Sequence, residues 1–151
     1  MSFDIDPAAV EISYLECVAK RETNILPLLV DLTNPSPGIG WQSEERTSLL
    51  ERGPADAVLA LALVHHLAIS NNVPLEKIAR FLSGICSNWL IIELVPKTDT
   101  QVRRLLSTRE DVFPDYTQAA FEHEFGKHFA VRTSIRVRES ERALYLMQRI
   151  A

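Results

Sequence analysis

The chain has 151 residues, of which 46% are hydrophobic and 24% are charged, and its formal net charge at pH 7 is -4. These values are typical of one globular domain and exclude a long disordered region or a fibrous repeat. The negative charge gives no overall attraction to an anionic membrane, so we expect no membrane partner, and nucleic acid is disfavoured as a partner without being excluded.

The cysteines and histidines do not indicate a disulfide framework or a metal centre. Cys17 and Cys86 are single and far apart, so a cytoplasmic location is the simplest expectation. His123 and His128 are five residues apart, which is off the i, i+4 spacing of a helical zinc pair, and we expect no metal ligands. The acidic residues after Met1 do not resemble a signal peptide, and no apolar run has the length of a membrane span.

The first third of the chain predicts a helix, a strand and a shorter helix. Asp6 and Pro7 are typical of a helix start, and apolar residues at helical spacing continue to about Arg21. A second apolar run then ends near Asp31 and predicts a strand. The remaining expected segments are a loop over 33–41 and a short helix that starts at Ser43, buries Leu49 and Leu50 and ends at Gly53-Pro54.

The almost wholly apolar run 55–67 is the segment around which we expect the fold to be built. Its length and composition predict a strand covered on both faces, as in a parallel sheet. Two histidines, His65 and His66, stand at its carboxyl end. Ligands of open α/β sheets bind just outside the carboxyl ends of the strands, so this pair marks a candidate site.

The second half of the chain alternates helix and strand patterns and closes with two alternating runs. We therefore predict one domain over 1–151 with a mostly parallel α/β sheet, helices on both faces and a C-terminal antiparallel hairpin. The expected elements are a helix carrying Ile78, Phe81, Leu82 and Ile85, a strand over 89–95, a helix capped by Thr98 or Asp99, a helix around Phe121, and hairpin strands over 129–138 and 143–147.

Four stretches give the chain a family resemblance. They are F-D-I-D-P-A-A-V-E over 3–11, L-L-V-D-L over 28–32, the run 55–67, and L-I-I-E-L-V-P-K over 90–97. With these stretches the chain resembles the class I, Rossmann-like S-adenosylmethionine-dependent methyltransferases, most of all a bacterial branch with some members labelled nodulation proteins. The resemblance implies a methyltransferase that uses S-adenosyl-L-methionine and methylates an unidentified acceptor, with a small molecule as the default.

The resemblance also implies roles for particular residues. Asp4 matches the acid that holds the ribose hydroxyls, and a role in capping the following helix is its alternative. Asp31 matches the acid that contacts adenine, with Leu32 offering its backbone N–H. Residues 62–65, which include Ala62 and Leu63, would border the cofactor's methionine and the acceptor. His65 and His66 are the catalytic candidates as general bases, and shaping the pocket floor is the alternative.

The chain departs from the family at its start, because the first strand and the glycine-rich loop would precede Asp4. Gly38-Ile39-Gly40 imitates that loop but does not follow its strand directly. Without the first strand, two strand edges would be unpaired, so either the chain rearranges to close the gap, a second copy in a homo-oligomer or a partner chain covers the edges, or the chain is part of a longer protein. We expect a shortened gene product or a fragment. The alternative function is a non-catalytic, degenerate methyltransferase module acting in assembly or partner binding. A nicotinamide-dependent oxidoreductase has less support.

Two further sets of residues have a structural and a functional interpretation. Trp41 and Trp89 are expected in core packing, with stacking on a ligand as the alternative. The arginines of the hairpin are expected on its solvated face, with binding of an acidic substrate as the alternative; they are Arg132, Arg136, Arg138 and Arg142.

Overall fold

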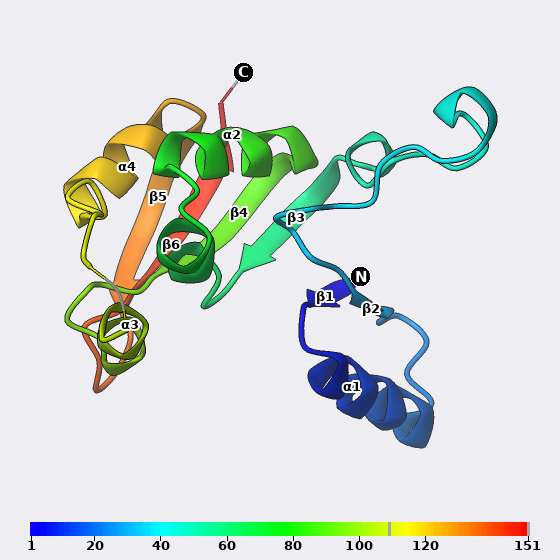
Figure 1. Ribbon diagram of the computed structural model, residues 1–151, viewed down its shortest axis with the longest axis horizontal. Helices are drawn as coiled ribbons and strands as arrows, with labels where there is room; N and C mark the ends of the chain where they lie inside the picture. Colours follow the sequence, from blue (N-terminus) through cyan, green and yellow to red (C-terminus); the bar gives the residue numbers. More distant parts are fainter. Residues whose placement is uncertain (109, 151) are drawn as a thin grey trace. The chain divides into compact units, whose positions relative to one another are not determined.

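The structure is a computed structural model that describes residues 1–108 and 110–150 (Figure 1). The chain divides into two compact units, Met1–Arg52 and Gly53–Ala151. Each unit has its own sheet within the described residues. The expectation of a single domain over the whole chain stays a prediction.

The first unit is built on a β-α-β motif. Its strands run parallel, with Asp4 opposite Leu29. The helix begins where predicted, because the Asp6 carboxylate accepts a 2.9 Å hydrogen bond from the backbone N–H of Ala8. It ends at Lys20, and the residue that caps it, Arg21, has a left-handed backbone with φ 52°. The elements are β1 (Ser2–Asp4), α1 (Pro7–Lys20) and β2 (Pro27–Leu29).

Residues 33–52 do not contain the short helix expected after Ser43, and that expectation is wrong. Ile39 and Arg46 instead exchange two backbone hydrogen bonds of 3.0 and 3.1 Å, which closes a loop. Within the loop, Gly40 has φ 90°, and Gln42 and Ser43 also have positive φ, which a helix does not allow. The two short 3-10 turns in this part are Trp41–Ser43 and Leu50–Arg52.

The conformation of this loop also determines the roles of Gly38, Gly40 and Trp41. A side chain at Gly38 would lie 2.6 Å from the carbonyl oxygen of Ser43, so Gly38 and Gly40 are required by the loop itself. They are therefore no evidence for a phosphate-binding motif. Trp41 is 77% exposed, so its expected place in the core is wrong.

The second unit contains a sheet with strand order β3-β4-β6-β5 (Figure 1). Strand β4 pairs in parallel with β3 and antiparallel with β6, which in turn pairs antiparallel with β5. The expected α/β class, the parallel pairing of β3 with β4 and the closing antiparallel hairpin are confirmed. The strands are β3 (Ala55–Ala60), β4 (Cys86–Leu94), β5 (Phe129–Arg136) and β6 (Ala143–Arg149).

Two helices pack against each other and against one face of this sheet. The core between them is aromatic, with the rings of Phe121 and Phe125 4.4 Å apart and those of Phe121 and Tyr145 5.2 Å apart. Leu90 and Met147, which are opposite each other in β4 and β6, are fully buried. The helices of this unit are η3 (His66–Ser70, a π turn), α2 (Leu75–Ile85), α3 (Thr100–Leu106) and α4 (Gln118–Gly126), of which α2 and α4 cover the sheet.

The opposite face of the sheet leaves large apolar side chains exposed. Leu59 is 63% exposed and Ile135 is 57% exposed. The expectation that the run 55–67 is one strand covered on both faces is therefore wrong. Strand β3 ends at Ala60, and the chain then turns at Ala62, whose backbone is left-handed with φ 49°.

Candidate functional site

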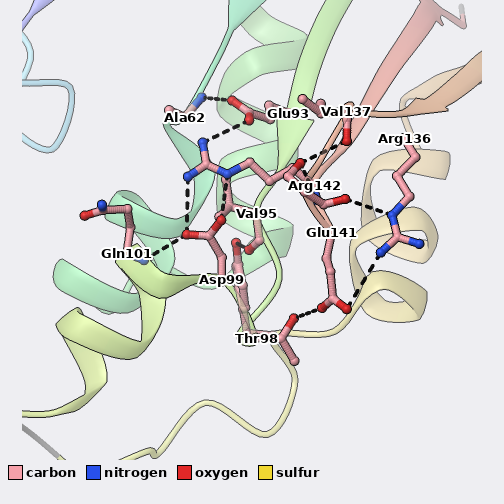
Figure 2. A network of polar contacts seen from close by, with 12 residues as sticks. Ala62, Glu93, Val95, Thr98, Asp99, Gln101, Arg136, Val137, Glu141 and Arg142 are labelled. Atoms are coloured by element: carbon pink, nitrogen blue, oxygen red, sulfur yellow. Dashed lines mark hydrogen bonds and ion pairs between the residues drawn. The ribbon is translucent and has the colours of Figure 1, made fainter.

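The carboxyl ends of β3 and β4 lie at the same edge of the sheet because the two strands are parallel. Glu93, near the end of β4, is buried. Its carboxylate accepts a 2.7 Å hydrogen bond from the backbone N–H of Ala62 (Figure 2). Glu93 thereby holds the turn through which the chain passes from β3 to His65 and His66.

Arg142, just before β6, joins this carboxylate to a second one. Its guanidinium donates to both oxygens of Asp99, at 2.7 and 3.2 Å, and to Glu93 at 3.3 Å (Figure 2). The side chain is 26% exposed, so the expectation that Arg142 lies on the solvated face is wrong. The cause is the register of the sheet, which pairs Leu94 with Ala143 and so brings Arg142 to the end of β4.

Asp99 links the network to α3. Its carboxylate accepts a 2.8 Å hydrogen bond from the backbone N–H of Gln101, so the expected helix cap is confirmed. The hydrogen bond from Arg142 lowers the pKa of Asp99 below its usual value. The cluster Glu93, Asp99 and Arg142, called here the strand-end network, therefore ties the turn after β3, the end of β4, the start of α3 and the hairpin together.

The two histidines have different surroundings. His65 is 2% exposed, and its Nδ1 has no hydrogen-bond partner among the described residues. Burial, with the neighbouring charges of His66 and Arg142, lowers the pKa of His65 to about 4. The imidazole is therefore neutral at pH 7 and a weak base. His66 is exposed, and the centres of the two rings are 4.1 Å apart. The catalytic roles of both stay predictions.

The first unit brings two predicted cofactor ligands to one sheet edge. Asp4 ends β1, and Asp31 lies just beyond β2, where the N–H of Val30 donates to the Asp4 carbonyl oxygen at 2.9 Å. One carboxylate oxygen of Asp4 accepts from the N–H of Asp6 at 2.9 Å. One oxygen of Asp31 accepts from the N–H and the hydroxyl of Thr33, at 2.8 and 2.7 Å, which lowers the pKa of Asp31.

These two acids fit a ligand that presents hydroxyl or amino donors. Within the described residues, Oδ2 of Asp4 accepts no hydrogen bond, whereas the Asp31 carboxylate also interacts with the backbone N–H of Asn34. The capping alternative for Asp4 therefore uses only one of its oxygens. Ala62 and Leu63 belong to the other unit, and there the Ala62 N–H is already bound by Glu93. Binding of a cofactor by Asp4, Asp31, Leu32, Ala62 and Leu63 stays a prediction.

Most of the site outside these residues was missed by reasoning from sequence. Glu93 and Arg142 are 49 residues apart, so no local pattern pairs them. One signal was present, because Glu93 interrupts an apolar strand, and a buried carboxylate requires a partner.

Two kinds of feature are absent from the described part of the chain. No group of three or more histidine, cysteine, aspartate or glutamate side chains could hold a metal ion there. Residues 1–108 and 110–150 also contain no helix with the length and hydropathy needed to cross a membrane.

The comparisons with known proteins identify one close relative by sequence. No protein-family model matches the chain. Among solved structures, it is similar to magnesium protoporphyrin IX methyltransferase from Synechocystis PCC 6803 with bound SAH, with a TM-score of 0.44 and 17% identity over 70% of this chain and 50% of that one. It is 42% identical to nodulation protein NoeA of Rhizobium meliloti (strain 1021) over 149 residues, which are 99% of this chain and 31% of NoeA. The expected similarity to proteins labelled nodulation proteins is thus confirmed, and the chain is a homologue of about a third of NoeA.

Proposed function

We propose that this chain is part of an S-adenosylmethionine-dependent methyltransferase that methylates an unidentified, small-molecule acceptor. The observation that supports this most is the position of Asp4 and Asp31 at the carboxyl ends of two adjacent parallel strands. That edge is where open α/β sheets bind ligands. Asp4 keeps one carboxylate oxygen free for a ligand within the described residues, and the sequence resemblance implies a cofactor role for both acids.

The proposal gives each residue a role. Bound S-adenosylmethionine supplies an electrophilic methyl group. Asp4 would accept hydrogen bonds from the ribose hydroxyls, and Asp31 with the N–H of Leu32 would contact adenine. His66, which is exposed, would accept the proton that the acceptor loses on methylation. His65, which is buried and neutral, would position the His66 ring by packing against it.

Calorimetric titration with S-adenosylhomocysteine tests this proposal. We expect binding to the chain, and about a tenfold or greater loss of affinity in Asp4→Asn, since a charged hydrogen bond is exchanged for a neutral one. Glu11→Gln, an exposed change in the same unit, is the matched control and should leave the affinity unchanged. A folded chain that gives no binding heat, or equal affinity in both variants, would contradict it.

A second candidate function is a non-catalytic module that binds a partner chain or a second copy. Helix α1 supports it, because it contains no buried residue and leaves Ile12, Tyr14, Leu15 and Val18 more than half exposed. Strands β1 and β3 each have an edge that no described strand covers. Stable association in light scattering, without binding of S-adenosylhomocysteine, would favour this function.

We also propose that the protein is cytoplasmic. Cys17 and Cys86 are both free, and Cys86 is buried. Free thiols persist in a reducing compartment. Recovery in the cytoplasmic fraction of its source cells would support this, and recovery in a secreted fraction would contradict it.

A further inference from the structure

A concavity of about 410 Å³ lies beside the strand-end network, between the start of η3 and α3. It is lined by His66, Gln101, Arg104, Leu105, Ser107 and Thr108. Helix α3 packs against η3, so two elements that follow neighbouring parallel strands form its walls. A second concavity, of about 440 Å³, is lined only by the hairpin turn 136–141 and brings no second element to it.

The charge of the first concavity selects an anion. Its only charged lining side chain among the described residues is Arg104, and no acid lines it. Arg104 also forms no side-chain hydrogen bond or ion pair with another described residue, unlike Arg142 nearby. A guanidinium without a partner binds a planar carboxylate or a phosphate through two parallel hydrogen bonds.

The other polar groups suit the same ligand. The side chain of Gln101 points away from Arg142, and its amide can donate to an oxyanion (Figure 2). His66 contributes an imidazole N–H. The hydroxyls of Ser107 and Thr108 already donate to backbone carbonyl oxygens of α3, so their protons do not reach a ligand.

Hydrogen bonds from the strand-end network hold both segments that form the walls of the concavity. Asp99 caps α3 and is itself held by Arg142, while Glu93 holds Ala62 in the turn that leads to His66. His65, buried below, packs against the His66 ring. The backbone that carries the lining residues therefore needs little further ordering when a ligand binds, and the remaining cost is the ordering of side chains such as that of Arg104.

We propose that this concavity binds an oxyanion group, a carboxylate or a phosphate, of the methyl acceptor, with Arg104 as its main ligand. The identification of the bound molecule as the methyl acceptor rests on the proposed methyltransferase function. The binding site itself does not depend on that function. An anionic acceptor held here would lie at the carboxyl ends of β3 and β4, next to His66.

Nuclear magnetic resonance can test the site without any cofactor. The isotope-labelled chain is titrated with sodium phosphate and, separately, with sodium acetate, while sodium chloride keeps the ionic strength constant. Saturable shifts are expected at the backbone signals of His66, Gln101 and Arg104. Arg104→Gln should weaken the binding about tenfold, whereas Arg103→Gln on the same helix, which does not line the concavity, should change it less than about twofold.

The pattern of shifts identifies the class of anion that binds. Shifts with phosphate alone assign a phosphate, shifts with acetate alone assign a carboxylate, and shifts with both assign an oxyanion of either kind. Absence of saturable shifts, or equal weakening in both variants, would overturn the proposal, because only net charge would then act. Loss of S-adenosylhomocysteine binding with anion binding intact would instead count against the proposed function and leave this site standing.

Discussion

The backbone N–H of Ala62 and the carboxylate of Glu93 are joined by a 2.7 Å hydrogen bond across the ends of two parallel strands. The bond connects residues 31 positions apart in the sequence. It explains how a turn with a left-handed alanine is kept beside the candidate site.

Replacing Glu93 tests how much this hydrogen bond contributes to the stability of the second unit. Glu93→Ala leaves the buried backbone N–H of Ala62 without its partner and removes one of the two carboxylates bound by Arg142, so the free energy of unfolding of the second unit should fall by about 1–3 kcal/mol. Glu93→Gln, which keeps a carbonyl oxygen for Ala62, should lose less. Urea unfolding followed by Trp89 fluorescence in a Trp41→Phe background measures both changes.

The control for these variants is Glu139→Gln. The Glu139 side chain is 85% exposed, so its loss should change stability by less than about 0.5 kcal/mol. Equal effects at Glu93 and Glu139 would show that the strand-end network contributes nothing specific.

Ala62→Gly should stabilise the second unit, although glycine usually destabilises a fold. Ala62 has φ 49°, where a Cβ atom is unfavourable, so glycine should raise the free energy of unfolding by up to about 1 kcal/mol. Ala57→Gly, in the exposed part of β3, should instead lower it by about 0.5–1 kcal/mol. The same urea series measures both, and a loss of stability at Ala62 would contradict the conformation of the turn.

His65 should make stability depend on pH. Its pKa is lowered from 6.5 to about 4 in the folded chain, so the unfolded chain binds more protons between these values. The free energy of unfolding therefore has its full value above pH 6.5. It should fall by roughly 3 kcal/mol as the pH drops toward 4. His65→Leu should remove that part of the slope when unfolding is measured from pH 7 to 4.

A ring signal gives a second test of His65. Its carbon-bound protons should titrate with a midpoint near pH 4 in the folded chain. A midpoint near 6.5, or an unchanged slope in His65→Leu, would contradict the burial of this imidazole.

The elements that sequence predicted well are those whose signals are local. The Asp6-Pro7 start of α1, the spacing that buries Ile78 and Leu82 in α2, and the alternation of the hairpin each lie within one element. The helix expected after Ser43 failed because loop pairing between Ile39 and Arg46 competes with helix capping.

The site was predicted only in part, for a related reason. Asp4 and Asp31 end strands, and strand ends can be read along the chain. The hydrogen bonds that join Arg142 to Glu93 and Asp99 depend on the register between β4 and β6, which no local sequence pattern determines. Arg104 likewise becomes a candidate ligand only once α3 and η3 are seen to pack together.

Mapping S-adenosylhomocysteine on the labelled chain by nuclear magnetic resonance tests the central claim most directly. We expect saturable shifts at the backbone signals of Asp4, Asp31 and Leu32, which Asp4→Asn weakens and Glu11→Gln leaves intact. Binding that shifts none of these three signals, or no binding by a chain whose spectrum shows it folded, would contradict the claim that the acids at the ends of β1 and β2 form a cofactor site.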